Sequence, residues 1–276
     1  MTCTRNWRLI IHSKHDPYMN MAVDETLLES VMEGRSNPVL RFYEWEKPTV
    51  SVGYFQKTQE LNLKNIVKHN LGFVRRPTGG QAVLHDKELT YSVTMNINNE
   101  KSLTDIFKKI NSSLIYGLRS FGINAEMFEK KNKEMLIQKN NLSNKSICFT
   151  SPSNYEIRVN SKKLLGSALM KRKYTIMQHG SLLFKYDPYI LFDIFNFKTD
   201  LKKETAVNLF NTTMTCINEE IRNKIKPSDL YKPLSEGFKS NFGAIFVNDS
   251  LDKYEKIISE KLYKEKYSCN KWNFMR

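Results

Sequence analysis

One cysteine and one lysine are the residues of this sequence best suited to covalent chemistry. Cys148 follows a polar segment, and Lys163 comes after one predicted strand and one tight turn. Because the chain reverses between them, we expect the two side chains to lie close together. The thiolate is the reactive form of cysteine, and a nearby ammonium raises the thiolate fraction. Such a pair could hold an acyl group as a thioester. An inert core position is the alternative for a single cysteine.

A second stretch, residues 75–95, reads RRPTGGQAVLHDKELTYSVTM. Gly79 and Gly80 permit positive φ angles and a close approach of the backbone to a ligand. Arg75 and Arg76 precede the glycines and His85 follows them, which is a plausible cradle for an acyl group or a phosphate. An ordinary hairpin with surface arginines is the alternative, since glycine pairs are common in turns.

Other kinds of chemistry find less support. His85 and His179 each lie beside a predicted strand, but neither has a second ligand at metal-binding spacing, so we predict no metal. The nucleophile elbow G-x-S-x-G of serine hydrolases is absent from the sequence. The remaining cysteines form no C-x-x-C pair, and we expect them to be inert and reduced; they are Cys3, Cys216 and Cys269.

Composition and charge limit the class of protein. The 276 residues are 40% hydrophobic and 12% aromatic, which is enough for one large α/β domain. Lys and Arg exceed Asp and Glu by 43 − 29 = 14, which favours an acidic partner. No nucleic-acid-binding motif is recognisable, so an acidic protein suits this charge as well as DNA does. No apolar run approaches 18 residues and no signal peptide is recognisable, so we expect a cytoplasmic protein without a membrane span.

The first half of the chain should alternate strands and helices. Asp16 and Pro17 begin a helix as its N-cap and first residue, and Gly34 ends it. Asn20 and Asp24 fall on its inner face, where we expect them to fix a neighbouring loop rather than to contact substrate. Further strands are expected at 7–12, 38–45, 49–55, 82–84 and 89–93, and further helices at 59–68 and 102–121. We expect the last two strands to form a hairpin, with His85-Asp86-Lys87-Glu88 as the turn between them.

The second half begins with a segment, 130–146, that is rich in Lys and Asn and predicts an exposed, mobile loop. Strands should follow at 155–159, 163–168, 176–183 and 244–247, the second of them with a break at Gly166, and helices at 205–221, 228–242 and 252–263. No linker divides the chain. We therefore expect a single catalytic domain over residues 1–276, with a core at about 35–250 and a C-terminal helical extension at 251–276.

Several ordered motifs resemble the lipoate–protein ligase A and octanoyltransferase family. They are DPYMNMAVDETLL, PVLRFYEWEKPTVSVGYFQ, RRPTGGQAVLHDKELTYSV, and KLLGSA followed by QHGSLL, and they span most of the chain. The resemblance implies an α/β (α+β) fold, the catalytic fold shared by biotin and lipoate protein ligases, with a mixed β-sheet flanked by helices.

The family divides into ATP-using ligases and acyltransferases that take an octanoyl group from acyl carrier protein. Ligases usually carry a third glycine where this chain has Gln81, and tend to have Gly-Asn where it has Lys87-Glu88-Leu89. The sequence ICFTSPSNYE around Cys148 resembles the cysteine-dependent octanoyltransferases. All three features favour the transferase branch.

The resemblance also implies roles for individual residues. Cys148 would carry the acyl thioester, and Lys163 would lower the pKa of the thiol and position the acyl carbonyl. Backbone N–H groups near Gly79–Gly80 or Gly166–Ser167 would stabilise the oxyanion. The residues expected to bind substrate are Arg75, Gly79, Gly80, His85, Gly166, Ser167, Ala168 and His179.

The implied reaction moves an octanoyl group from octanoyl-acyl carrier protein to a lysine of a lipoyl domain, such as the glycine cleavage H protein. It belongs to protein lipoylation and lipoate biosynthesis. We expect no cofactor, since the acyl group arrives on the carrier's phosphopantetheine, no nucleic-acid or membrane partner, and a monomer. An apolar slot for the acyl tail would contribute roughly 5 kcal/mol at ~0.8 kcal/mol per buried CH₂.

Three alternatives stay open at this stage. The first is an ATP-dependent lipoate–protein ligase. The second is an amidotransferase that moves the acyl group from one lipoyl domain to another. The third is a protein of a different class, either a basic nucleic-acid-binding module or an inactive regulator that binds lipoyl domains.

Overall fold

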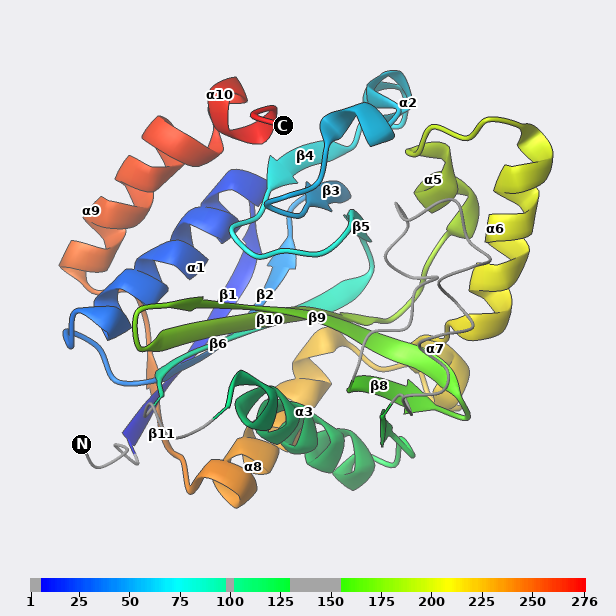
Figure 1. Cartoon of the computed structure of the whole chain (residues 1–276). Helices are drawn as coiled ribbons and strands as arrows, with labels where there is room; N and C mark the ends of the chain where they lie inside the picture. Colours follow the sequence, from blue (N-terminus) through cyan, green and yellow to red (C-terminus); the bar gives the residue numbers. More distant parts are fainter. Residues whose placement is uncertain (1–5, 98–101, 130–154) are drawn as a thin grey trace.

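The computed structural model of the chain describes residues 6–97, 102–129 and 155–276. An eight-stranded sheet runs through this part of the molecule, and a three-stranded sheet lies over one of its faces (Figure 1). Cys148 and the loop expected at 130–146 lie outside the described residues. No helix in the described ranges is both long enough and apolar enough to span a bilayer.

The large sheet has the strand order β11-β1-β2-β6-β10-β9-β8-β7. The strands β11, β1 and β2 are parallel to one another, and the remaining neighbours pair antiparallel. The mixed sheet expected from the sequence is therefore confirmed. Its strands are β1 (Asn6–His15), β2 (Val39–Trp45), β6 (Glu88–Asn96), β7 (Glu126–Phe128), β8 (Glu156–Val159), β9 (Lys162–Arg172), β10 (Thr175–Leu183) and β11 (Ile245–Asp249).

One face of the large sheet is covered by α3 (Leu103–Ser120) and α8 (Tyr231–Phe242), which pack against each other (Figure 1). Ser102 caps α3 through a bond from the Asp105 backbone N–H. The predicted apolar stripe of α3 supplies Ile110, Leu114 and Leu118 to the main hydrophobic core. This face therefore carries most of the apolar core. The cavity described below lies on the opposite face of the sheet.

The other face is covered by α1 (Pro17–Met32) and by the small sheet, β4-β3-β5. Asp16 caps α1, accepting bonds from the backbone N–H groups of Tyr18 and Met19, as the Asp-Pro pair predicted. The strands of the small sheet are β3 (Thr49–Val52), β4 (Gly72–Arg75) and β5 (Val83–His85). The small sheet packs on a second apolar cluster with the helices α2 (Leu63–Lys68), α5 (Pro188–Asp193) and α6 (Asp200–Thr213).

The C-terminal segment folds back over α1. It contains α9 (Lys253–Leu262), a π-helical turn (Tyr263–Tyr267) and α10 (Asn270–Asn273). Lys266 and Tyr267 both contact the Glu25 carboxylate on α1. Strand β1 pairs with both β2 and β11 and so belongs to the large sheet. The sheet and the helix α1 that covers it therefore begin before residue 35, the start of the core that we expected from the sequence.

Three expected elements differ from the structure. The segments 82–84 and 89–93 are strands, but β5 belongs to the small sheet and β6 to the large one, so in the described chain they form no hairpin. Strand β9 continues through Gly166 because β10 pairs with it along its length. The helix expected at 205–221 divides into α6 and α7 (Ile217–Glu220), because Met214 adopts an extended conformation and pairs with Lys163.

Candidate active site

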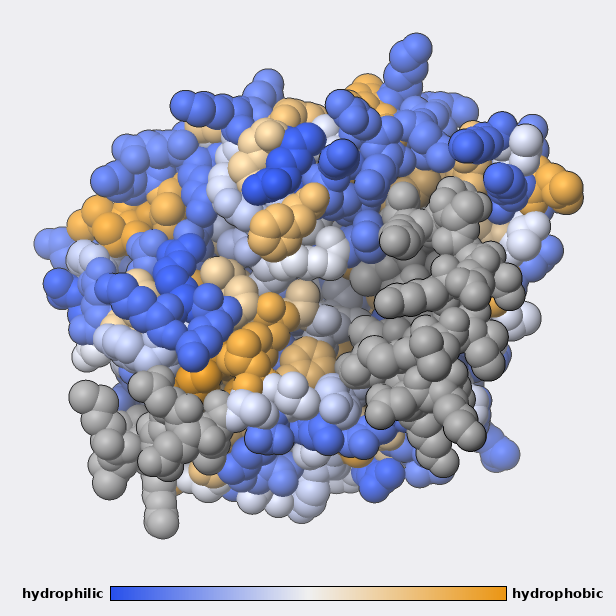
Figure 2. Space-filling view, in the orientation of Figure 1, coloured by the Kyte–Doolittle hydropathy of each residue, from blue (hydrophilic) through white to orange (hydrophobic). Residues whose placement is uncertain are grey.

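A cavity of about 170 Å³ lies between the small sheet and the large sheet. Its lining is mostly apolar, and it includes residues of α1, of both sheets and of the glycine turn before β5. Figure 2 shows hydrophobic side chains gathered in the middle of the face that Figure 1 presents, with hydrophilic side chains around them. An apolar cavity with a few convergent polar groups is the usual form of a small-molecule site.

The floor of the cavity is built by strand register. Tyr43 on β2, Thr90 on β6, Ser181 on β10 and Gly166 on β9 lie opposite one another across the sheet. Residues in register share one face, and all four line the cavity. With about 4.8 Å between neighbouring strands, this row extends over ~14 Å. The floor is therefore a groove across four strands.

A β-bulge brings Lys163 to the cavity. Ile157 of β8 pairs with Leu165, whereas the next residue, Arg158, pairs with Lys163, so Leu164 is an extra residue on β9. Regular alternation would turn Lys163 toward the apolar core. Because a bulge re-aims the side chains beside it, Leu164 and Leu165 are both buried in the core and Lys163 lines the cavity.

The Lys163 ammonium belongs to a small group of charges. Its Nζ lies 2.8 Å from Glu156 Oε1, and Arg158 Nη2 lies 3.1 Å from Glu156 Oε2. The Arg158 guanidinium also stacks over the Phe128 ring, 3.6 Å from its centroid. Among the described residues, this group of two cations and one carboxylate carries one net positive charge beside the cavity. A thiolate or an oxyanion would be stabilised there.

The glycine turn closes against β3. A Cβ on Gly53 would lie 1.9 Å from the carbonyl oxygen of Gly80, so the two backbones touch only because Gly53 has no side chain. Gly80 has a φ of +94°, which favours glycine. The Arg76 guanidinium holds the turn by donating to the carbonyl oxygens of Gly79 and Gln81. The turn at residues 76–81, which we call the cavity roof, therefore packs directly against the backbone of Gly53.

The two arginines before the turn have different surroundings. Arg76 lines the cavity. Arg75 is fully buried, and its Nη1 donates to the carbonyl oxygens of Gly53 and Gln56, while its Nε donates to Asn273 O. Arg75 therefore joins the cavity roof to the C-terminal segment and does not line the cavity.

His85 lies between a hydroxyl and a carboxylate. Its Nε2 is 2.7 Å from Ser51 Oγ, and its Nδ1 is 2.7 Å from Glu88 Oε1. The ring stacks on Trp45 at 4.1 Å between centroids. Ser181 and Thr90 donate to the same Glu88 oxygen. Burial alone would raise the pKa of Glu88, but the contacts with His85, Thr90 and Ser181 together bring that pKa below its usual value.

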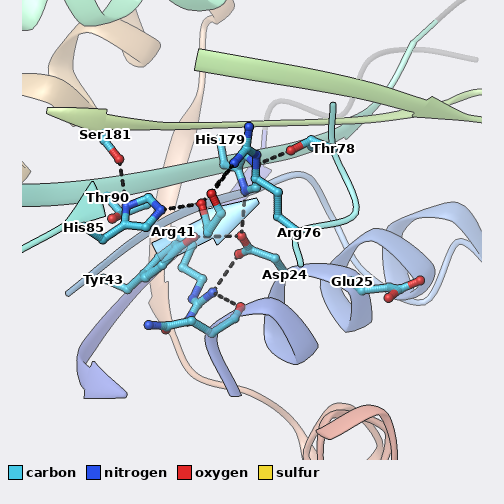
Figure 3. A network of polar contacts seen from close by, with 12 residues as sticks. Asp24, Glu25, Arg41, Tyr43, Arg76, Thr78, His85, Thr90, His179 and Ser181 are labelled. Carbon is cyan, nitrogen blue, oxygen red and sulfur yellow. Dashed lines mark hydrogen bonds and ion pairs between the residues drawn. The ribbon is translucent and has the colours of Figure 1, made fainter. Parts of the chain in front are cut away.

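His179 has a similar pair of partners, as Figure 3 shows. Its Nε2 lies 2.6 Å from Thr78 Oγ1, and its Nδ1 lies 3.3 Å from Asp24 Oδ2. Asp24 also contacts the Arg41 guanidinium, at 2.6 Å, and accepts from Tyr43. Burial lowers the pKa of His179, while Arg41 and His179 outweigh burial and lower the pKa of Asp24. This histidine is therefore held as a neutral ring.

The structure brings most of the predicted site residues into one cavity. Those that line it are Gly80, His85, Lys163, Gly166, Ser167, Ala168 and His179. Gly79 is adjacent to the lining but not part of it. Cys148 cannot be placed, because it lies outside the described residues. Within those residues no group of three His, Cys, Asp or Glu side chains could hold a metal ion.

Four residues of the site were not predicted from the sequence as site residues: Asp24, Ser51, Glu88 and Ser181. Asp24 was expected to fix a loop, yet it reaches His179 on β10. The register of β10 offered one signal, since Ser181 lies two residues after His179 and so shares its face. The pairing of Ser51 and Glu88 with His85 had no sequence signal, because it joins three strands of two sheets.

The chain belongs to the family of the lipoyl protein ligase A/B catalytic domain, whose model matches residues 16–239. It is 39% identical over 274 residues to the octanoyltransferase LipM of Brevibacillus brevis, covering 98% of this chain and 99% of that protein. It is 37% identical over 275 residues to the octanoyltransferase LipM of Bacillus subtilis, covering 98% of both. The family resemblance seen in the motifs is confirmed.

Solved structures support the fold. A lipoate–protein ligase A bound with ATP matches with a TM-score of 0.79 and 25% identity, covering 98% of each chain. A bipartite lipoate protein ligase from Thermoplasma acidophilum matches with a TM-score of 0.82 at 22% identity, covering 98% of this chain and 97% of that one. The predicted ligase-type catalytic fold is therefore confirmed, although the relatives closest in sequence among these are transferases.

Proposed function

We propose that the chain transfers an octanoyl group from octanoyl-acyl carrier protein to a lysine of a lipoyl domain, through a thioester on Cys148. Octanoyl transfer in protein lipoylation follows from the octanoyltransferase relatives at 36% to 39% identity over nearly the full chain. The carrier-protein donor, the lipoyl-domain acceptor and the cysteine thioester are the proposed parts.

One observation carries the proposal: Lys163 is turned by a bulge onto the wall of an apolar cavity, beside Gly166 and Ser167. A thiol attacks a thioester only as the thiolate, and a neighbouring ammonium favours that form. Glu156 holds the ammonium in place, and Arg158 supplies a second positive charge on the other oxygen of Glu156. We infer that the Cys148 sulfur works at this wall.

The strand beside Lys163 also offers backbone donors for an oxyanion. In the described part of the chain, β8 pairs with β9 only as far as Leu165, so β9 runs on from Gly166 to Arg172 with β10 as its one neighbour. On such an edge, alternate N–H groups point away from the neighbouring strand. These donors lie where the acyl carbonyl would be held, beside Lys163.

The reaction has two halves. The Cys148 thiolate attacks the octanoyl thioester, and the carrier's phosphopantetheine thiol leaves. The acceptor lysine then attacks the enzyme thioester, the C–S bond breaks and an amide forms. An amide is more stable than a thioester, so no ATP is required. The acyl tail would lie in the groove over β10, β6 and β2, at ~0.8 kcal/mol per buried CH₂.

The test is intact mass measurement after mixing the enzyme with octanoyl-acyl carrier protein in the absence of ATP. We expect an octanoyl adduct that hydroxylamine removes, on the wild type and not on Cys148→Ala. Lys163→Met should form the adduct more slowly near neutral pH, with a deficit that shrinks as pH rises and ionises the thiol. Lys162→Met is the matched control, because Lys162 is the adjacent lysine on β9 and does not line the cavity.

The contrary result would be no adduct from the carrier, but product from free lipoate and ATP. That result would make the chain a ligase. If Lys162→Met and Lys163→Met were equally slow, the role of Lys163 in activating the thiol would be withdrawn. We also propose a monomer without cofactor, and electrostatic steering of acidic partners by the net charge of +14. Added salt should then raise the KM for the carrier protein.

A further inference from the structure

The second half-reaction needs a proton acceptor. A lysine side chain has a pKa near 10.4, so at neutral pH the acceptor amine is almost entirely an ammonium ion, which cannot attack a thioester. A general base within the cavity would supply the neutral amine and typically contributes ~10²- to 10⁴-fold in rate. This inference rests on the proposed function, since it concerns the acceptor step of that reaction.

Ser51, His85 and Glu88 are arranged as such a base. Ser51 Oγ lies 2.7 Å from His85 Nε2, and His85 Nδ1 lies 2.7 Å from Glu88 Oε1. This is the order hydroxyl, imidazole, carboxylate that deprotonates a hydroxyl in serine hydrolases. Ser51 and His85 line the cavity together with Lys163, while the Glu88 carboxylate is fully buried behind them.

The carboxylate determines which nitrogen of His85 carries the proton. An ionised Glu88 can only accept, so the bond to Oε1 requires a proton on Nδ1 of His85. The lowered pKa of Glu88 agrees with an ionised side chain. In the neutral ring, Nε2 is then the unprotonated nitrogen, and it faces Ser51. Trp45 holds the ring in this orientation by stacking on it.

The charges around His85 favour the same assignment. Glu88 on β6 is the anion that contacts the ring. Arg76, after β4, donates to Ser51 Oγ at 3.0 Å and so makes the hydroxyl a better proton donor to His85. The other charged or titratable groups of the cavity lining are Lys163 on β9, His179 on β10 and Tyr43 on β2.

The second histidine does not have this access. His179 Nε2 faces Thr78 Oγ1, and the Thr78 side chain is buried and is not part of the cavity lining. Its carboxylate, Asp24, is already paired with Arg41. A relay through Thr78 would therefore have no path from the cavity, and a proton on His179 would meet no uncompensated anion.

We propose that Ser51 and His85 form a proton relay that deprotonates the acceptor lysine, with Glu88 as the positioning carboxylate. The bound ammonium gives one proton to Ser51 Oγ, and the Ser51 proton passes to His85 Nε2. The neutral nitrogen attacks the thioester carbon, an N–C bond forms and the C–S bond breaks. The second nitrogen proton goes to the departing Cys148 sulfur, and His85 releases its proton to solvent.

The experiment separates acylation from transfer. Wild type, Ser51→Ala and Glu88→Gln are each loaded with octanoyl from the carrier protein, and thioester formation is checked by intact mass. A lipoyl domain is then added, and the loss of the thioester is followed in a single turnover. We expect both variants to load, and to transfer to the lysine about 10²-fold or more slowly than wild type.

Hydroxylamine provides the readout that a structural role would not change. It is neutral at neutral pH and needs no base, so it should discharge the wild type and both variants at similar rates. Raising the pH toward 10 should also narrow the deficit with lysine, because the neutral amine then forms without the relay. Thr78→Val, which removes the matching hydroxyl beside His179, is the control and should transfer at nearly the wild-type rate.

Two results would overturn the relay. If hydroxylamine discharge slows as much as lysine transfer, the network only positions the acyl group. If Ser51→Ala and Thr78→Val behave alike, Ser51 has no special part in proton transfer. Failure of the wild type itself to form a thioester is a separate outcome, and it would overturn both the proposed function and the relay that depends on it.

Discussion

Two histidines share one cavity, and each lies between a hydroxyl and a carboxylate. In one set, Thr78–His179–Asp24, the carboxylate contacts the Arg41 guanidinium and both charged side chains are fully buried. In the other set, Ser51–His85–Glu88, the carboxylate is contacted by His85 and by uncharged donors from Trp45, Thr90 and Ser181. Similar residue types thus have different electrostatic surroundings.

The difference shows that charge balance decides what a buried histidine can do. Asp24 is compensated by Arg41, so a proton on His179 would add an uncompensated positive charge, and burial lowers the pKa of this ring. Among the described residues, the donors to Glu88 besides His85 are uncharged, so a proton on His85 would complete an ion pair. The first set therefore stabilises the fold, and the second is suited to accept a proton.

The largest effect is expected from Arg41→Met. The substitution leaves the Asp24 carboxylate buried without its guanidinium, and removal of one partner of a buried ion pair typically costs about 3–5 kcal/mol. Urea unfolding should show this loss. An unchanged midpoint would mean that Asp24 simply becomes protonated, and that the charge balance assigned to the first set is wrong.

The next largest effect is expected from acid, which should reduce the stability contributed by the two sets at different pH values. Burial lowers the pKa of His179, so the unfolded chain binds more protons and stability falls as pH drops below about 6.5. The pKa of Glu88 is lowered too, so its contribution is present above about pH 4.3 and is lost as pH falls through the folded-state value. His179→Gln should flatten the stability curve near pH 5–6.5, where His12 and His15 also contribute.

Glu88→Gln should flatten the same curve below about pH 4.3, where Glu88 makes its own contribution. Both variants are measured by urea unfolding across the pH range, with Lys162→Met as a surface control. If Glu88→Gln left the slope below about pH 4.3 unchanged, the assignment of Glu88 as an ionised side chain with a lowered pKa would fail.

A smaller effect is expected from Trp45→Phe. The substitution keeps an aromatic ring to stack on His85 but removes the Nε1 donor, which lies 2.8 Å from Thr90 Oγ1 and 3.2 Å from Glu88 Oε1. Loss of a bond in a buried charged network should cost about 1–2 kcal/mol in unfolding free energy. An unchanged unfolding free energy would show that the hydrogen bonds from Thr90 and Ser181 are sufficient for Glu88 without Trp45.

The smallest effect is expected from Thr78→Val. It removes the hydroxyl 2.6 Å from His179 Nε2 in a volume-matched side chain. The cost should be about 0.5–1.5 kcal/mol, the usual net value of a neutral hydrogen bond, and thermal unfolding can measure it. A cost several times larger would mean that the Thr78 set is as strongly charged as the Glu88 set.

Much of the fold was predicted from patterns among residues that are close together in the sequence. The Asp16-Pro17 cap, the Ser102 cap and the apolar stripe of α3 are features of neighbouring residues, and the structure contains all three. The ordered motifs identified the family, which the relatives confirm. The expected hairpin from β5 to β6 failed because turn residues such as His85-Asp86-Lys87-Glu88 do not reveal whether the strands they join lie in one sheet or in two.

The sequence by itself determined the family, the mixed sheet and the stretches that form the cavity. Only the tertiary structure decided which side chains meet there. A β-bulge turned Lys163 to the cavity, and Glu88 came within hydrogen-bond distance of His85. Arg75 is buried and bonds to the Gly53 carbonyl, whereas Arg76 lines the cavity. The physical reason is that strand alternation and helix period act between near neighbours, whereas hydrogen bonds and charge balance join residues brought together by packing of separate elements.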